Sequence, residues 1–129
     1  MSDRSLRTPL AKVRGLGSAK GGTHHFWLQR LTAIALIPLT VWFALSVASL
    51  SGADQATVQA WMKSPLSATL MISFLVAGFW HMKLGIQVVI EDYVHGEAAK
   101  ITLLILNNLI SIFLGLAATL SVLKMLLGS

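Results

Sequence analysis

One histidine and one lysine interrupt an apolar stretch of 25 residues, Leu66–Ile90. His81 lies nine residues before the end of this stretch, a depth of about 14 Å at the rise of an α-helix. An imidazole at that depth needs a polar partner, and haem iron is one such partner. Gly78 and Gly85, at i−3 and i+4, share its face and would leave room for a flat macrocycle. The alternative is a structural histidine bonded to a neighbouring helix, with the glycines allowing close packing.

The histidine count limits how a haem could be held. The chain has four histidines, His24, His25, His81 and His95, and no cysteine. Only His81 lies within an apolar stretch, so a haem with two histidine ligands would take the second from another polypeptide. The lack of cysteine excludes a disulfide scaffold, and an iron–sulfur cluster or Cys-ligated zinc site held by this chain.

Other polar residues in the apolar stretches have simpler interpretations. Lys83 lies about 200° around the helix axis from His81, so it is expected to reach toward the membrane surface or a polar group of another subunit. The last apolar stretch carries small and polar residues at helical spacing: Asn108, Ser111, Gly115 and Ala118. Such a stripe is typical of tight helix packing, and we interpret it as structural.

Three apolar stretches must position these residues: Leu31–Leu50, Leu66–Ile90 and Ile101–Leu123. Each has the roughly 20 residues that a membrane span requires, and none shows the polar stripe of a soluble amphipathic helix. Hydrophobic residues make up 55% of the 129 and charged residues 12%, a composition that argues against a soluble enzyme and excludes a disordered chain. We therefore expect an all-α integral membrane protein, one membrane-anchor domain over residues 1–129 with three transmembrane helices in an up-down-up bundle.

Residues 1–30 form a basic leader with six of the ten Lys and Arg residues and a single acid, Asp3. The positive-inside rule then places the N-terminus in the cytoplasm, residues 51–65 in the periplasm, residues 91–100 in the cytoplasm and the C-terminus in the periplasm. Basic side chains also favour contact with anionic membrane lipid. No nucleic-acid-reading motif accompanies them, so we expect no nucleic-acid partner. Gly21–Thr23 is expected to be a flexible joint where the first helix starts.

Two motifs give the chain a resemblance to a known family. The run from Gly22 to Ile34, GTHHFWLQRLTAI, resembles the G-x-H-x-F and R-x-T-A-I segments that open the first helix of the succinate dehydrogenase hydrophobic membrane anchor, the D subunit of respiratory complex II. His81 is followed eleven residues later by Asp92 and Tyr93, which is similar to the H-x10-D-Y pattern of that family. The resemblance covers nearly the whole chain.

The resemblance implies a role for each matching residue. His81 would be an axial ligand of haem b, with the opposite ligand supplied by a cytochrome b anchor subunit. Arg30 would bind a haem propionate through its paired N–H donors, assisted by His24. Tyr93 would donate a hydrogen bond to a ubiquinone carbonyl, with Asp92 orienting the site. The resemblance assigns no role to three nearby polar residues: Lys83, Gln87 and His95.

The function that the resemblance implies is anchoring and electron delivery, with no catalysis on succinate by this chain. A flavoprotein subunit would oxidise succinate, an iron–sulfur subunit would pass electrons to ubiquinone, and this subunit would tether both and form part of the quinone site. The anchor of a quinol:fumarate reductase and a small non-redox membrane protein remain open as alternatives. The expected location is a bacterial inner membrane; the Arg-rich leader is also compatible with a mitochondrial inner membrane.

Overall fold

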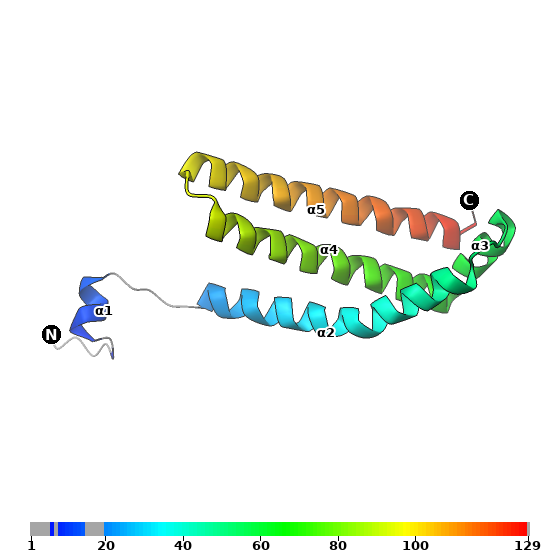
Figure 1. Ribbon diagram of the computed structural model, residues 1–129, viewed down its shortest axis with the longest axis horizontal. Helices are drawn as coiled ribbons and strands as arrows, with labels where there is room; N and C mark the ends of the chain where they lie inside the picture. Colours follow the sequence, from blue (N-terminus) through cyan, green and yellow to red (C-terminus); the bar gives the residue numbers. More distant parts are fainter. Residues whose placement is uncertain (1–5, 7, 15–19, 129) are drawn as a thin grey trace.

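A computed structural model describes Leu6, residues 8–14 and residues 20–128 of the chain. Regular structure in these residues is entirely helical, and Figure 1 shows its arrangement. The helices are α1 (Pro9–Val13), α2 (Lys20–Ser49), α3 (Gln55–Met62), α4 (Pro65–Tyr93) and α5 (Glu97–Leu126). Three of them, α2, α4 and α5, are long and apolar enough to cross a membrane. The predicted all-α membrane fold with three spanning helices is confirmed.

The long helices extend beyond the apolar stretches from which they were predicted. α2 begins eleven residues before Leu31, and α5 begins four residues before Ile101. A helix that ended inside the hydrocarbon region would leave backbone groups without hydrogen bonds, so the ends lie in polar sequence instead. α2 begins at Lys20, one residue before the expected start at Gly21–Thr23, but the expected joint there is wrong because these residues are helical. Arg30 therefore lies well inside a helix.

α4 lies between α2 and α5 and packs against both, whereas no described part of α2 lies close to α5. Phe43 stacks on Phe74 with ring centroids 4.7 Å apart, and Thr32 contacts His81 further along the same pair of helices. Residue numbers therefore rise along α2 as they fall along α4, so these helices are antiparallel. Figure 1 shows that α5 runs antiparallel to α4 in turn. The three spanning helices form a row with α4 in the middle.

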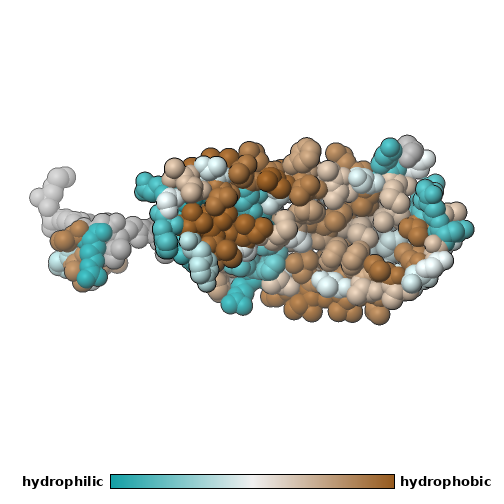
Figure 2. Space-filling view, turned by 45° about the horizontal axis from the view of Figure 1, so that its top comes forward, coloured by the Kyte–Doolittle hydropathy of each residue, from teal (hydrophilic) through white to brown (hydrophobic). Residues whose placement is uncertain are grey.

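The row buries few side chains, and its hydrophobic cluster lies at the α3 end. Met62, Ala68 and Val122 are buried there, and Trp61 of α3 stacks on Trp42 of α2 at 5.7 Å. Elsewhere most large hydrophobic side chains of α2 and α5 are exposed. Figure 2 shows this apolar surface along the bundle, with hydrophilic atoms gathered mainly at its two ends. Such surfaces suit contact with lipid or with further membrane subunits.

α2 contains Pro38 and bends in its second half, as Figure 1 shows. A proline inside a helix lacks the N–H that would bond to the carbonyl four residues earlier, and its ring crowds that carbonyl. The bend leaves the straight first half of α2, which carries Thr32, alongside the half of α4 that carries His81.

Candidate functional site

His81 of α4 contacts α2 through one edge of its imidazole. Its Nδ1 lies 3.0 Å from the Oγ1 atom of Thr32. The Thr32 Oγ1 atom also lies 2.8 Å from the carbonyl oxygen of Leu28 and 3.1 Å from that of Gln29. The imidazole is half-buried, and Thr32 is its only hydrogen-bond partner among the described residues. Its Nδ1 is thus engaged within the chain, while Nε2 remains available to a group from outside.

The two glycines beside His81 have different surroundings. A Cβ added to Gly85 would meet no atom within 4 Å, whereas one added to Gly78 would lie 3.9 Å from Cδ2 of Leu36 on α2. Gly85 therefore leaves open space on the His81 face. Gly78 is covered by α2, so only Gly85 provides the clearance that the sequence suggested for both.

Arg30 and His24 lie on α2 and are both exposed. The Arg30 guanidinium carbon lies 5.2 Å from the centroid of the Phe26 ring, a cation–π contact. Arg30 precedes Thr32 by two residues, about 200° around the helix. The chain alone therefore does not bring Arg30 to the His81 imidazole, and its guanidinium remains accessible to an external anion.

The sequence suggested no specific role for His25, the residue next to His24. Its side chain is half-buried, and its Nε2 atom is shielded from solvent without a hydrogen-bond partner in the described structure. His24 faces outward instead. The two neighbouring histidines thus have different environments, although the sequence alone gives no basis for telling them apart.

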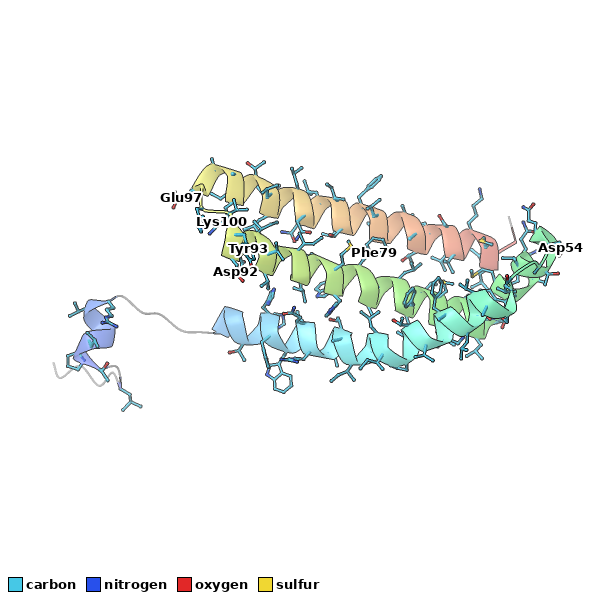
Figure 3. The ribbon with its side chains drawn as sticks, viewed as in Figure 1. Asp54, Phe79, Asp92, Tyr93, Glu97 and Lys100 are labelled. Carbon is cyan, nitrogen blue, oxygen red and sulfur yellow. The ribbon has the colours of Figure 1, made fainter. Side chains whose placement is uncertain are left out.

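Asp92 and Tyr93 are the last two residues of α4, which continues three residues beyond the predicted stretch Leu66–Ile90. Both side chains are exposed, with 77% of the Tyr93 surface accessible. Figure 3 shows them at the end of the row where α4 turns into α5, with Glu97 and Lys100 nearby. They lie eleven and twelve residues from His81, so the phenol is about 18 Å along the helix from the imidazole. Two separate sites therefore lie on α4.

The end of α4 is held by side-chain contacts. Lys100 Nζ of α5 donates a hydrogen bond of 3.3 Å to the carbonyl oxygen of Glu91, one of the carbonyls that a helix end leaves without an intrahelical partner. The Glu91 carboxylate accepts a bond of 2.8 Å from Gln87 Nε2. These contacts fix the short connection between α4 and α5 and so the backbone position of Tyr93.

Lys83 lies against an aromatic ring of its own helix, and the α5 stripe packs against α4 with one change of residue. Lys83 Nζ lies 5.0 Å over the ring of Trp80, and its backbone carbonyl accepts a hydrogen bond from Asn107. Asn107 and Ser111 are buried against α4, whereas Asn108 Nδ2 bonds to the Leu104 carbonyl of its own helix. Asn107, rather than Asn108, therefore joins the two helices.

No group of three or more His, Cys, Asp or Glu side chains lies together in the described residues. A metal site built wholly from these residues is thus not seen, and His81 stands as a single candidate ligand. Thr32 also lines an open, mainly apolar groove of about 390 Å³ between α2 and α4, with Leu28, Val76 and Trp80 among its walls.

Comparison with known proteins agrees with this architecture. Residues 4–122 match the family described as Succinate dehydrogenase/Fumarate reductase transmembrane subunit. The chain is 34% identical over 107 residues to a succinate dehydrogenase hydrophobic membrane anchor subunit from Rickettsia bellii, covering 83% of this chain and 86% of that one. It is 36% identical over 93 residues to the corresponding subunit from Paracoccus denitrificans, covering 72% of each.

A third relative is similar to the same extent. The succinate dehydrogenase membrane anchor subunit of Reclinomonas americana is 35% identical over 96 residues, which cover 72% of this chain and 80% of that subunit. The match spans nearly the whole chain, and three helices of membrane-spanning length and composition accompany it. The chain is therefore a multi-pass membrane protein that belongs to the family of succinate dehydrogenase and fumarate reductase transmembrane subunits.

Proposed function

We propose that this chain is the membrane-anchoring subunit of a succinate:ubiquinone oxidoreductase, and that it holds haem b through His81. The observation that carries the haem assignment is the state of the His81 ring. Its Nδ1 is engaged by Thr32, and its Nε2 has no partner among the described residues. A neutral imidazole with one ring nitrogen bonded to the protein and the other free is the usual donor for haem iron.

The haem requires a second protein. The other three histidines lie at the ends of the row or in the polar connection, so an opposite imidazole would come from a cytochrome b anchor subunit. Haem supplies a one-electron redox centre when bound. Arg30 and His24, both exposed in the N-terminal half of α2, are the residues of this chain proposed to bind its propionates. A guanidinium binds a carboxylate through two parallel N–H donors.

Ubiquinone is proposed to bind at the end of α4. The Tyr93 hydroxyl is exposed and offers one donor to a quinone carbonyl, while its ring supplies an apolar wall. Asp92, also exposed and adjacent in the chain, is proposed to orient the site. Neither side chain is enclosed by this chain, so the rest of the pocket would come from the cytochrome b and iron–sulfur subunits.

The chain would tether the flavoprotein and iron–sulfur subunits to the membrane. With the basic leader in the cytoplasm, Tyr93 and the N-terminal end of α2 face the same side, since α2 and α4 are antiparallel. The exposed apolar faces of α2 and α5 would contact lipid and the second anchor subunit. A bacterial inner membrane is the proposed location, and a mitochondrial inner membrane fits the same arrangement.

The spectrum of the assembled complex tests this function. We expect a b-type haem in the complex purified with its partner subunits, and its loss or loosening in His81→Ala. Lys83→Met removes the other ionisable side chain in the middle of α4 and should leave the haem spectrum intact. A His81→Ala complex with an unchanged low-spin spectrum would refute the ligand assignment, and a colourless parent would favour a non-redox membrane protein.

The anchor of a quinol:fumarate reductase is the second candidate, because the matching family includes both enzymes. The relatives described above are all named as succinate dehydrogenase subunits, which favours the first assignment. Measuring both directions of the reaction in the same preparation would distinguish them.

A further inference from the structure

The hydrogen bond between Thr32 and His81 joins a hydroxyl group to a ring nitrogen. The hydroxyl carries one proton, and the ring nitrogen is protonated in one tautomer of the imidazole and unprotonated in the other. A threonine hydroxyl has one donor and two acceptor sites, and a neutral imidazole has one N–H and one lone pair. The short distance of 3.0 Å between Oγ1 and Nδ1 fits either direction of donation. The other contacts of Thr32 decide which direction applies.

The Thr32 hydroxyl has a backbone acceptor of its own. Its Oγ1 lies 2.8 Å from the carbonyl oxygen of Leu28, four residues earlier in α2, which is the usual acceptor for a threonine hydroxyl inside a helix. A hydroxyl that donates its only proton to this carbonyl can act toward His81 solely as an acceptor. Nδ1 of His81 must then carry the proton, and the lone pair lies on Nε2.

We infer that Thr32 is a positioning residue that holds His81 in the Nδ1–H tautomer and fixes its ring for iron binding through Nε2. The inference rests on the proposed haem role of His81 and names a residue of a different helix as its partner. Such partners fix the orientation of a ligating histidine and raise its basicity as a ligand. In this chain that role would be carried across the α2–α4 interface.

Other threonines of the spanning helices provide the comparison. Thr69 and Thr102 also donate to the carbonyl four residues earlier, at 2.7 Å and 2.8 Å, but both are exposed and neither is hydrogen-bonded to a histidine among the described residues. Thr32 makes the same local bond and uses its remaining acceptor capacity on another helix. Thr102→Val is therefore a matched control, because it removes a back-bonded hydroxyl and leaves the His81 contact in place.

The test uses the complex assembled with its partner subunits and three substitutions at one position. Thr32→Val keeps the side-chain shape and removes the hydroxyl that accepts the hydrogen bond from His81. Thr32→Ser keeps a hydroxyl acceptor, and Thr32→Cys replaces it with a thiol, which is a weak acceptor. The readouts are the midpoint potential of the haem, the largest g value of its oxidised form, and the rate of haem transfer to apomyoglobin. None of these depends on quinone reductase activity.

We expect Thr32→Val to raise the midpoint potential, because a less basic ligand stabilises ferric iron less. We expect it to shift the g value and to speed haem transfer by about 10- to 100-fold, the factor by which loss of such a partner typically weakens metal binding. Thr32→Ser should restore all three readouts, Thr32→Cys should give an intermediate potential, and Thr102→Val should match the parent.

Two results would overturn the inference. One is a Thr32→Val complex whose potential, g value and haem transfer equal those of Thr102→Val. The other is a Thr32→Cys complex whose haem has the same midpoint potential as the parent. This second result decides the question if the valine variant fails to assemble. Failure of the underlying haem assignment is distinguishable from both, because it would appear as an unchanged spectrum in His81→Ala.

Discussion

The side-chain amide of Asn107 donates a hydrogen bond of 2.9 Å from Nδ2 to the backbone carbonyl of Lys83, linking α5 to α4. Asn107 is buried, and its Oδ1 lies 3.4 Å from Oγ of Ser111, so both ends of the amide are bonded. Lys83 follows His81 by two residues. This contact therefore fixes the position of α5 against the same part of α4 that carries the candidate iron ligand.

Removing this amide should loosen the α4–α5 pair. We expect Asn107→Ala to cost about 0.6 to 1.7 kcal/mol, the average and the largest value measured for interhelical hydrogen bonds in a membrane protein. The midpoint of thermal inactivation of the assembled complex should fall. Asn108→Ala is the matched control, because Asn108 bonds to its own helix and should matter less. Equal losses from the two alanine variants would contradict the assignment of Asn107 as the interhelical contact.

Membrane topology follows from the charge of the leader. Because six basic residues precede the first apolar stretch, we expect the N-terminus to remain in the cytoplasm. Reporter fusions after Ala56 and after Ser129 should report the periplasm, and a fusion after His95 should report the cytoplasm. Cytoplasmic activity from the Ser129 fusion would be inconsistent with three crossings.

The Tyr93 hydroxyl is expected to act on quinone reduction alone. Tyr93→Phe keeps the ring and removes one donor, at a cost of about 1–3 kcal/mol, or roughly 5- to 150-fold in rate. Quinone reductase activity should fall by this factor, while succinate oxidation with a dye that accepts electrons upstream stays near the parental rate.

Trp27→Phe gives a control for a general interfacial role of aromatic side chains. Trp27 is exposed on α2 near the same end of the row. If Tyr93 serves only as an interfacial aromatic, both variants should behave like the parent in both assays. An equal loss of the two activities in Tyr93→Phe would indicate defective assembly and would not support a quinone contact.

Asp54 gives a pH-dependent contribution to α3. Its Oδ1 accepts a hydrogen bond of 2.9 Å from the Thr57 backbone N–H, and the side chain and backbone of Thr57 together lower the pKa of Asp54 from its ordinary value of 3.8. A carboxyl with a lower pKa in the folded state stabilises the fold above its unfolded pKa. That contribution should be lost as the pH falls below 3.8 through the folded value.

Hydrogen exchange of α3 measures this effect directly. Amide protection of Gln55–Met62 should be lower in Asp54→Ala than in the parent at pH 7, and the difference should shrink at pH values below the folded pKa. Asp54→Asn retains a capping oxygen that does not titrate, so its protection relative to the alanine variant should be independent of pH. A pH response in the asparagine variant equal to that of the parent would argue against the carboxyl as the cause.

The sequence determined that three segments span the membrane. A spanning segment must satisfy its backbone hydrogen bonds within itself, and the bilayer sets its length, so apolar runs of 20 to 25 residues specify such helices without tertiary information. The sequence also isolated His81 as the one histidine within an apolar run. It underestimated the length of the helices, because hydropathy marks the hydrocarbon region and the helices continue into polar sequence at Lys20 and Tyr93.

Only the tertiary structure decided which faces of these helices meet. Helical periodicity groups residues on a face but does not say which helix that face contacts. It therefore could not choose Asn107 over its neighbour Asn108, or identify His25 as the more enclosed of two adjacent histidines. The partnership of Thr32 with His81 joins residues 49 positions apart, and it exists because α4 packs in the middle of the row with its His81 face against α2.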